Sequence, residues 1–178
     1  MTFTATAEAV RYLGGEVVFV DSLKDSPHMD VQDLEKKILA ILEGRNPYQL
    51  EKPIGPKLAG KKPRAICAVH YGGLAQDMPK LLSIARQYGL FLVEDAAHSF
   101  PSYIDNLGYA GSLGDIGVFS FYATKTITSA EGGMIVCKDK AHAARMSTMR
   151  LHGIDRPVWQ RYSKTTVSWD YDVVDAKY

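Results

Sequence analysis

The sequence has few of the features that mark secreted, membrane or nucleic-acid-binding proteins. Only two of its 178 residues are cysteines, Cys67 and Cys137, and both lie in apolar runs, so we expect buried thiols in a reducing compartment. Lysine and arginine number 21 against 20 aspartates and glutamates, and this balance does not favour a nucleic-acid partner. The longest strongly apolar runs, such as 65–69 and 116–121, are too short to cross a bilayer. The N-terminus lacks the basic and apolar regions of a signal peptide, so we expect a cytoplasmic protein.

Several common catalytic motifs are also missing. The sequence contains no G-x-G-x-x-G loop for dinucleotides, no G-x-x-x-x-G-K-[ST] loop for nucleoside triphosphates and no G-x-S-x-G elbow. No H-E-x-x-H or paired Cys and His spacing indicates a metal site. Gly108, Gly111 and Gly114 recur at intervals of three, which is typical of a turn-rich connection.

What the sequence does contain is an alternation of short apolar runs and segments of helical periodicity. The apolar runs predict strands at 17–20, 65–69, 90–93, 116–121 and 134–137. Helices are predicted from an N-cap at Asp30 to Gly44, from an N-cap at Asp77 to Gly89, and over 139–149. The segment 44–64, rich in proline and glycine, is expected to be an exposed loop. This pattern predicts an α/β fold with a mostly parallel sheet and helices on both faces.

Polar residues follow two of these strands, where ligands bind in such sheets. Asp95 ends one strand, and Ser120 and Lys125 lie at the end of another. A partly desolvated lysine can act as an amine nucleophile, and a serine hydroxyl beside turn N–H groups can hold a phosphate. An acid, a lysine and a phosphate site suit pyridoxal phosphate. An ion pair between Asp95 and Lys125 would explain those two residues equally well.

Longer blocks carry a resemblance to a known family. The principal blocks are Glu94-Asp-Ala-Ala-His-Ser99, Gly114-Asp-Ile-Gly-Val-Phe-Ser-Phe121 and Thr124-Lys-Thr-Ile-Thr-Ser-Ala-Glu-Gly-Gly133. Shorter blocks in the same order are Thr2-Phe-Thr-Ala-Thr6, Val69-His-Tyr-Gly-Gly73, Leu151-His-Gly153 and Trp169-Asp-Tyr-Asp172. Together they resemble the DegT/DnrJ/StrS family of pyridoxal-phosphate-dependent nucleotide-sugar aminotransferases over nearly the whole chain.

The resemblance implies both a fold and a reaction. Residues 1–152 would form an aspartate-aminotransferase-like (fold type I) large-domain core, and 153–178 would begin the connection to a C-terminal small domain. The reaction would transfer an amino group, with glutamate as donor, to a nucleotide-linked keto-deoxysugar in cell-surface polysaccharide or amino-sugar biosynthesis. A homodimer or a complementary chain would complete the protein.

The resemblance also implies the two central site residues. Lys125 would form a Schiff base with pyridoxal 5'-phosphate and move the proton between the amino-donor carbon and the cofactor carbon. Asp95 would pair with the protonated pyridine nitrogen, which keeps the ring an electron sink.

Four further residues would contact the cofactor. Ala97 and Phe3 would pack on the two faces of the ring, His98 would reach its phenolic oxygen, and Ser120 would hold its phosphate. Phe3 could equally be a core residue, and Ser120 a structural hydroxyl. His70 and Tyr71 are expected to border the same pocket.

Two departures from the family pattern matter. Family members are longer, so the alternative is a truncated, catalytically inactive relative that at most binds cofactor or a partner chain, with apolar surface left exposed. Ala130 stands where the family usually has glycine, and a positive φ there would cost about 1 kcal/mol.

A third possible reaction is sugar dehydration on the same fold. Dehydratases of the family replace the lysine by histidine, whereas this chain keeps Lys125.

Overall fold

The computed structural model describes residues 1–48, 58, 60–154 and 173–174. The chain forms two compact units, 1–136 and 137–178. The second unit contains α4 (Lys140–Met149), which begins where the Asp139 side chain accepts the N–H of His142. This helix was predicted over 139–149. The predicted domain boundary after residue 152 stays a prediction, and the family block 169–172 lies outside the described residues.

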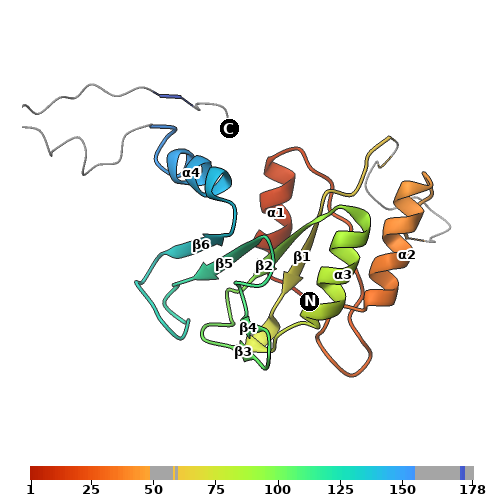
Figure 1. Cartoon of the computed structure of the whole chain (residues 1–178), viewed down its shortest axis with the longest axis horizontal. Helices are drawn as coiled ribbons and strands as arrows, with labels where there is room; N and C mark the ends of the chain where they lie inside the picture. The colour runs from red at the N-terminus through yellow and green to blue at the C-terminus, as the bar shows by residue number, and fades with distance from the viewer. Residues whose placement is uncertain (49–57, 59, 155–172, 175–178) are drawn as a thin grey trace, which may run out of the picture. The chain divides into compact units, whose positions relative to one another are not determined.

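A four-stranded sheet organises the first unit. It has the order β1 (Ala65–Val69), β2 (Phe91–Asp95), β5 (Ile116–Ser120) and β6 (Gly133–Cys137) (Figure 1). β1 pairs with β2 and β2 with β5 in parallel, with Val69 opposite Asp95 and Asp95 opposite Val118. These strands are the apolar runs predicted from 65 onward. Because the three strands are parallel, their carboxyl ends lie at one edge of the sheet.

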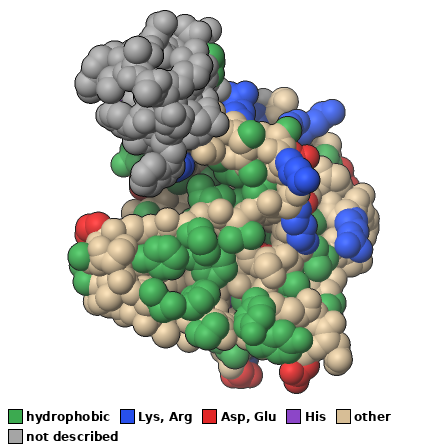
Figure 2. Space-filling view, turned by 60° about the vertical axis from the view of Figure 1, so that its left-hand side comes forward, with side chains coloured by type: hydrophobic (Ala, Val, Ile, Leu, Met, Phe, Trp, Pro, Cys, Tyr) green, Lys and Arg blue, Asp and Glu red, His purple; other side chains and the backbone are tan. Residues whose placement is uncertain are grey.

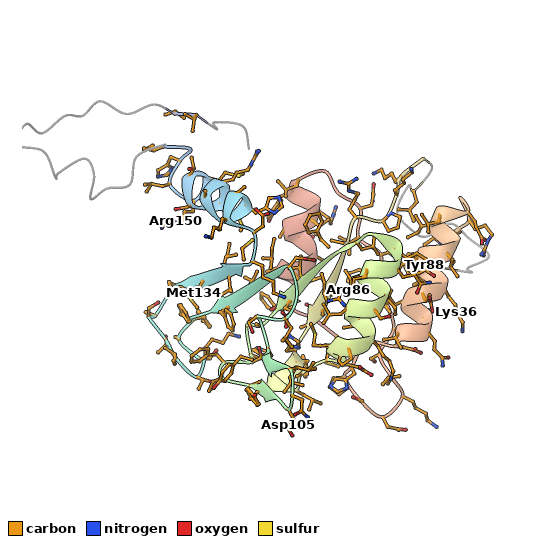
Figure 3. The ribbon with its side chains drawn as sticks, in the orientation of Figure 1. Lys36, Arg86, Tyr88, Asp105, Met134 and Arg150 are labelled. Atoms are coloured by element: carbon orange, nitrogen blue, oxygen red, sulfur yellow. The ribbon has the colours of Figure 1, made fainter. Side chains whose placement is uncertain are left out.

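Two helices cover one face of this sheet. α3 (Met78–Tyr88) packs on β1 and β2, and α2 (Val31–Leu42) packs on α3 (Figure 1). Figure 3 labels Tyr88, whose hydroxyl donates from α3 to Glu35 of α2 at 2.9 Å. The buried core between helices and strands includes residues from all four elements, among them Leu34, Ile38, Ile66, Leu81 and Leu92. The alternating burial of β1 and β2 puts every second side chain into this core.

Capping residues set the ends of these helices as the sequence predicted. The Asp30 carboxylate accepts the N–H groups of Gln32 and Asp33 at the start of α2. The Asp77 carboxylate accepts the N–H of Lys80 at the start of α3, and Gly89 ends that helix with φ +63°.

The opposite face of the sheet carries a helix that the sequence analysis did not predict. α1 (Thr4–Tyr12) has no buried residue, and its N-cap residue Phe3 makes no side-chain cap, so the capping signal that marked α2 and α3 is missing. The Thr6 hydroxyl donates to Asp95 at 2.7 Å, and Asp95 projects from β2 away from the face that bears Leu92 and Glu94. Helices therefore contact both faces of the sheet, as predicted.

The prediction of a strand at 17–20 is wrong. The backbone N–H of Phe19 donates to the Tyr48 hydroxyl at 2.6 Å, and that of Asp21 donates to the Asp33 carboxylate at 2.8 Å. Side-chain oxygens of other segments thus accept the backbone N–H groups that would otherwise pair with a neighbouring strand. The β-branched run indicated extended backbone but could not show what the backbone would pair with.

The connection from β2 to β5 is turn-rich, as the glycine spacing predicted. It contains a short antiparallel pair, β3 (Tyr103–Ile104) and β4 (Gly108–Tyr109), that was not predicted. Gly111 and Gly117 lie so close that a β-carbon on Gly117 would overlap the Gly111 carbonyl oxygen. The glycines therefore let this connection pack directly on the backbone of β5.

Large hydrophobic side chains lie exposed on the first unit. Met134 and Ile135 of β6 are 44% and 53% exposed, and Figure 3 labels Met134 on that strand. Figure 2 turns the molecule to bring the side that carries β6 forward, and hydrophobic side chains gather there over a broad area. Tyr122 and Ile127, between β5 and β6, are also about half exposed. The exposure agrees with the apolar surface expected from the sequence.

No helix in the described ranges is long and apolar enough to span a membrane. Cys67 and Cys137 are both free thiols and partly buried. Burial, together with the charge of Asp95, raises the pKa of the Cys67 thiol to about 12, so this thiol is unreactive at neutral pH.

Candidate functional site

A cavity of about 200 Å³ lies at the carboxyl edge of the sheet, where the parallel-strand topology places the ends of β2 and β5. The residues that line it come from the turns after β1, β2 and β5. They are Gly72, Ala97, His98, Phe100, Ser120, Phe121, Thr124, Lys125, Thr126 and Ile127. Four of the six predicted site residues are thus brought together: Lys125, His98, Ser120 and Ala97.

Lys125 is held by the loop between β5 and β6. Its backbone N–H donates to the carbonyl of Tyr122 at 2.9 Å, which forms a turn directly after β5. The Phe121 carbonyl accepts from both the Ser129 N–H at 2.9 Å and the Thr128 hydroxyl at 3.0 Å, so the loop closes on itself. The side chain of Lys125 is partly buried, and its amine has no hydrogen-bond or ion-pair partner among the described residues. It is available to a ligand in the cavity.

His98 enters the cavity in a defined tautomer. The backbone N–H of Gly72 donates to its Nδ1 at 3.2 Å, so Nδ1 carries no proton. The neutral imidazole then bears its proton on Nε2 and offers a hydrogen-bond donor. The Tyr71 ring meets His98 edge-on, with ring centroids 6.0 Å apart. His98 is therefore suited to bind an oxygen atom of a ligand.

Asp95 ends β2, two residues before Ala97 of the cavity wall, but it does not itself line the cavity. Its Oδ2 accepts the Thr6 hydroxyl hydrogen at 2.7 Å, and its Oδ1 accepts the N–H of Ala97 at 3.2 Å. No described cation lies within ion-pair distance of the carboxylate, so the ion pair with Lys125 considered from the sequence is absent from the structure as described. Each oxygen keeps a lone pair for a further donor.

Ser120 is the last residue of β5 and shares the sheet face of Asp95. Its Oγ accepts the N–H of Tyr122 at 3.3 Å, which leaves the hydroxyl hydrogen free to be donated. A hydroxyl at the end of a strand, followed by a tight turn, is a suitable donor for a phosphate oxygen.

Phe3 lies apart from the other predicted residues. It is 78% exposed and lines a second hollow of about 420 Å³ together with residues of α1 and the segment after it. Its backbone carbonyl accepts the N–H of Thr6 at 3.2 Å, and Thr6 in turn donates to Asp95. The stacking role of Phe3 stays a prediction, and the described structure does not bring its ring to the cavity.

A buried hydrogen-bond network around Glu94 was missed by the sequence analysis. The Glu94 and His70 side chains are both 0% exposed, and His70 Nε2 donates to Glu94 Oε2 at 2.9 Å. The same carboxylate accepts the backbone N–H groups of Gly111 at 2.8 Å, Leu113 at 2.7 Å and Gly114. The expectation that His70 borders the pocket is wrong, because its ring is enclosed here. Successive side chains of a strand point to opposite faces, and this alternation could have predicted that Glu94 is buried while Asp95 faces the other side.

Two further contacts tie this network to the turn that holds His98. The N–H of Gln76 donates to His70 Nδ1 at 3.1 Å, so His70 is the tautomer with hydrogen on Nε2. The amide of Gln76 donates in turn to the carbonyl of Val69 at 2.7 Å. The β1 end and its turn are thereby fixed in place.

The charge of Glu94 is stabilised by these donors. Burial raises the pKa of Glu94, but the hydrogen bonds from His70 and the N–H groups of Gly114 and Gly111 outweigh burial, and the pKa lies below its ordinary 4.5. Glu94 therefore remains ionised at neutral pH, with a structural role.

The described residues contain no cluster of three or more His, Cys, Asp or Glu side chains that could hold a metal ion. The chemistry that the site offers is that of one amine, one carboxylate, one imidazole N–H and hydroxyl groups.

Comparison with known proteins places the chain in a family. Residues 1–176 match the DegT/DnrJ/EryC1/StrS aminotransferase family. The spore coat polysaccharide biosynthesis protein SpsC of Bacillus subtilis is 34% identical over 179 residues, covering 100% of this chain and 40% of that protein. GDP-perosamine synthase of Escherichia coli O157:H7 is 32% identical over 171 residues, covering 96% of this chain and 40% of that protein. The chain thus spans about 40% of the length of these curated relatives.

Solved structures agree with this placement. A DegT DnrJ EryC1 StrS aminotransferase from Brucella abortus has a TM-score of 0.73 and 36% identity, over 85% of this chain and 37% of that chain. The PLP form of the putative sugar aminotransferase Spr1654 from Streptococcus pneumoniae has a TM-score of 0.71 over 100% of this chain and 42% of that chain; at 24% identity it shows the fold alone. The predicted α/β core of fold type I is thus confirmed. The chain belongs to the DegT/DnrJ/EryC1/StrS aminotransferase family.

Proposed function

We propose that the chain is the cofactor-binding core of a pyridoxal-phosphate-dependent aminotransferase that transfers an amino group from glutamate to a nucleotide-linked keto-deoxysugar. The observation that supports this most is the convergence of Lys125, His98 and Ser120 on one cavity, at the sheet edge where Asp95 ends β2. These groups come from turns after two parallel strands, where α/β sheets bind their ligands.

The side chains fit the cofactor chemically. Pyridoxal phosphate needs an amine for its aldehyde, a carboxylate for its ring nitrogen, a donor for its phenolic oxygen and donors for its phosphate. Lys125 offers an amine without a protein partner in the described structure, and His98 offers an Nε2 hydrogen. When bound, the cofactor supplies an aldehyde carbon and a ring that withdraws electrons.

Lys125 would bond covalently through Nζ to the aldehyde carbon, whose oxygen would leave as water. After the amino donor displaces it, the freed amine would carry the proton from the donor carbon to the cofactor carbon. The loop that closes on Phe121 fixes the backbone of Lys125 at the cavity wall. The same side chain would therefore be in place for both the covalent bond and the proton transfer.

The other residues would orient the ring. Asp95 would accept the ring N–H, His98 would donate to the phenolic oxygen, and Ser120 would donate to the phosphate. Ala97 would pack on one ring face, and the small side chain leaves room for the ring to lie flat. Phe3 is the proposed contact of the other face.

The size of the cavity limits how much of the substrate it can hold. At about 200 Å³ it is smaller than the about 300–1,000 Å³ of pockets that enclose drug-sized ligands. It has room for a single ring, so the nucleotide of the sugar substrate would contact surfaces outside it. We propose that a second copy or a complementary chain provides these surfaces, and that the product serves polysaccharide or amino-sugar biosynthesis, as the names of the relatives SpsC and GDP-perosamine synthase suggest.

The Schiff-base role is tested by the visible absorption of the cofactor bound to the purified chain. Wild type should develop the band of a lysine-bound cofactor, and Lys125→Ala should not. Lys36→Ala, which removes an exposed lysine of α2, is the matched control and should behave as wild type. An unchanged spectrum in Lys125→Ala would refute the assignment of Lys125.

Turnover separates an active enzyme from a chain that only binds cofactor. Glutamate added to the cofactor-loaded chain should convert the cofactor to its aminated form and release 2-oxoglutarate. Binding without this conversion, in the presence of glutamate, would support the alternative of an inactive relative.

A further inference from the structure

Two threonine hydroxyls form a directed chain that ends on Asp95. Thr2 Oγ1 donates to Thr6 Oγ1 at 2.8 Å, and Thr6 Oγ1 donates to Asp95 Oδ2 at 2.7 Å. An ionised carboxylate can only accept, so Thr6 must be the donor at that end. The hydroxyl of Thr6 therefore accepts from Thr2, which fixes the direction of the whole chain.

The hydroxyl of Thr6 is not used in the way usual for a helix. A threonine within a helix commonly bonds to a carbonyl of the preceding turn, and one at the N-cap bonds to an N–H of the first turn. Thr6 lies in the first turn of α1, where the N-cap residue Phe3 makes no side-chain cap. Its hydroxyl instead reaches a residue 89 positions away. Since α1 has no buried residue, this bond is a specific contact that local helix formation does not require.

The carboxylate of Asp95 is thereby held from two elements. The backbone of the turn after β2 holds Oδ1 through the N–H of Ala97 at 3.2 Å, and α1 holds Oδ2 through Thr6. Rotation of the carboxylate about its bond to the β-carbon would break at least one of the two bonds. One plane is thus selected before any ligand binds, and a lone pair on each oxygen remains for a further donor.

We propose that Thr6 is a positioning residue that orients the Asp95 carboxylate toward the ring N–H of a bound pyridine-type cofactor. The inference rests on the proposed function, in which Asp95 accepts that N–H. Thr6 itself touches no cofactor atom in this proposal and acts only through Asp95. A preoriented acceptor avoids the ordering cost that a freely rotating carboxylate would add to binding.

The test is a comparison of two cofactors on four proteins. Pyridoxal phosphate and its 1-deaza analogue, in which a C–H replaces the ring nitrogen, are titrated into wild type, Thr6→Val, Thr6→Ser and Thr4→Val. Thr6→Val keeps the shape and removes the hydroxyl, and Thr6→Ser keeps the hydroxyl. Thr4→Val makes the same change at an exposed site in the same turn. Absorbance or fluorescence gives each dissociation constant.

We expect Thr6→Val to weaken binding of pyridoxal phosphate about tenfold, the effect of one hydrogen bond to a charged group. Its affinity for the deaza analogue should equal that of wild type, since the analogue has no ring N–H for Asp95 to accept. Thr6→Ser and Thr4→Val should bind both compounds as wild type does. If Thr6→Val does not fold, as judged by its urea unfolding, Thr6→Ala is measured in its place.

Two results would overturn the inference. An equal loss of affinity for both cofactors would show that Thr6 supports the fold of the site and not the orientation of Asp95. An unchanged affinity of Thr6→Val for pyridoxal phosphate would show that Asp95 needs no such support. Failure of the proposed function is distinct from both, because then wild type itself would bind neither compound.

Discussion

Glu94 and Asp95 are adjacent carboxylates on β2 that lie on opposite faces of the sheet. Glu94 points toward the helix-covered face, is 0% exposed and accepts hydrogen bonds from His70 and three backbone N–H groups. Asp95 points to the other face and accepts one hydroxyl and one N–H. The pleat of a strand thus separates, within two residues, a carboxylate whose acceptor capacity is occupied from one that retains capacity for a ligand.

The hydrogen bonds of Glu94 support the site by joining the segments around β2. The donors that saturate Glu94 come from the turn after β1 and from the connection before β5, so this side chain ties together the segments on both sides of β2. The same turn supplies the Gly72 N–H that sets the tautomer of His98. The saturated network around Glu94 thus supports the turn that orients His98, while Asp95 keeps a lone pair on each oxygen for a ligand.

The largest difference between the two carboxylates should be in stability. Glu94→Gln should lower the free energy of unfolding by about 3–5 kcal/mol, because it removes a buried charge on which four donors converge. Asp95→Asn should lower it by less than about 1 kcal/mol, since that group is only partly buried. Urea unfolding of the three proteins measures both. Equal losses of stability in the two variants would show that Glu94 contributes no more to the stability of the fold than Asp95 does.

A smaller effect is expected in the pH dependence of stability. The pKa of Glu94 in the folded chain lies below its ordinary 4.5, because the hydrogen bonds from His70 and the backbone outweigh burial. Its ionisation therefore stabilises the fold above about pH 4.5, and this contribution is lost as the pH falls through the lower folded value. Wild type should lose stability over this acid range more steeply than Glu94→Gln. Parallel curves from urea unfolding at several pH values would contradict the assignment.

The smallest expected effect lies in the loop that carries Lys125. Ala130 has φ +67°, a left-handed conformation that glycine adopts without steric cost. Ala130→Gly should raise the free energy of unfolding by about 0.5–1 kcal/mol, because relief of strain exceeds the added chain entropy. Ala123→Gly is the control in the same loop and should give no gain, since Ala123 is not among the positive-φ residues. Thermal or urea unfolding distinguishes the two, and similar changes in both variants would argue against strain at Ala130.

Local patterns predicted the elements that a short stretch of chain can specify. The buried runs at 65–69 and 116–121 are strands because their side chains are apolar, whatever their partners. The N-caps Asp30 and Asp77 begin helices because a carboxylate satisfies N–H groups two or three residues ahead. The prediction of a strand at 17–20 is wrong because the Phe19 N–H donates to the Tyr48 hydroxyl, and the N–H of Asp21, just after the run, donates to the Asp33 carboxylate.

The sequence by itself indicated the individual strands, a mostly parallel sheet and, with it, the edge at which Asp95, Ser120 and Lys125 were expected, because periodicity and capping act over a few residues. Only the tertiary structure decided which polar groups meet there. Thr6 reaches Asp95, His70 turns inward to Glu94, and Phe3 lies at another hollow. Such contacts join residues that are far apart in the chain, and a hydrogen bond forms only where the packing of whole elements brings two groups within about 3 Å.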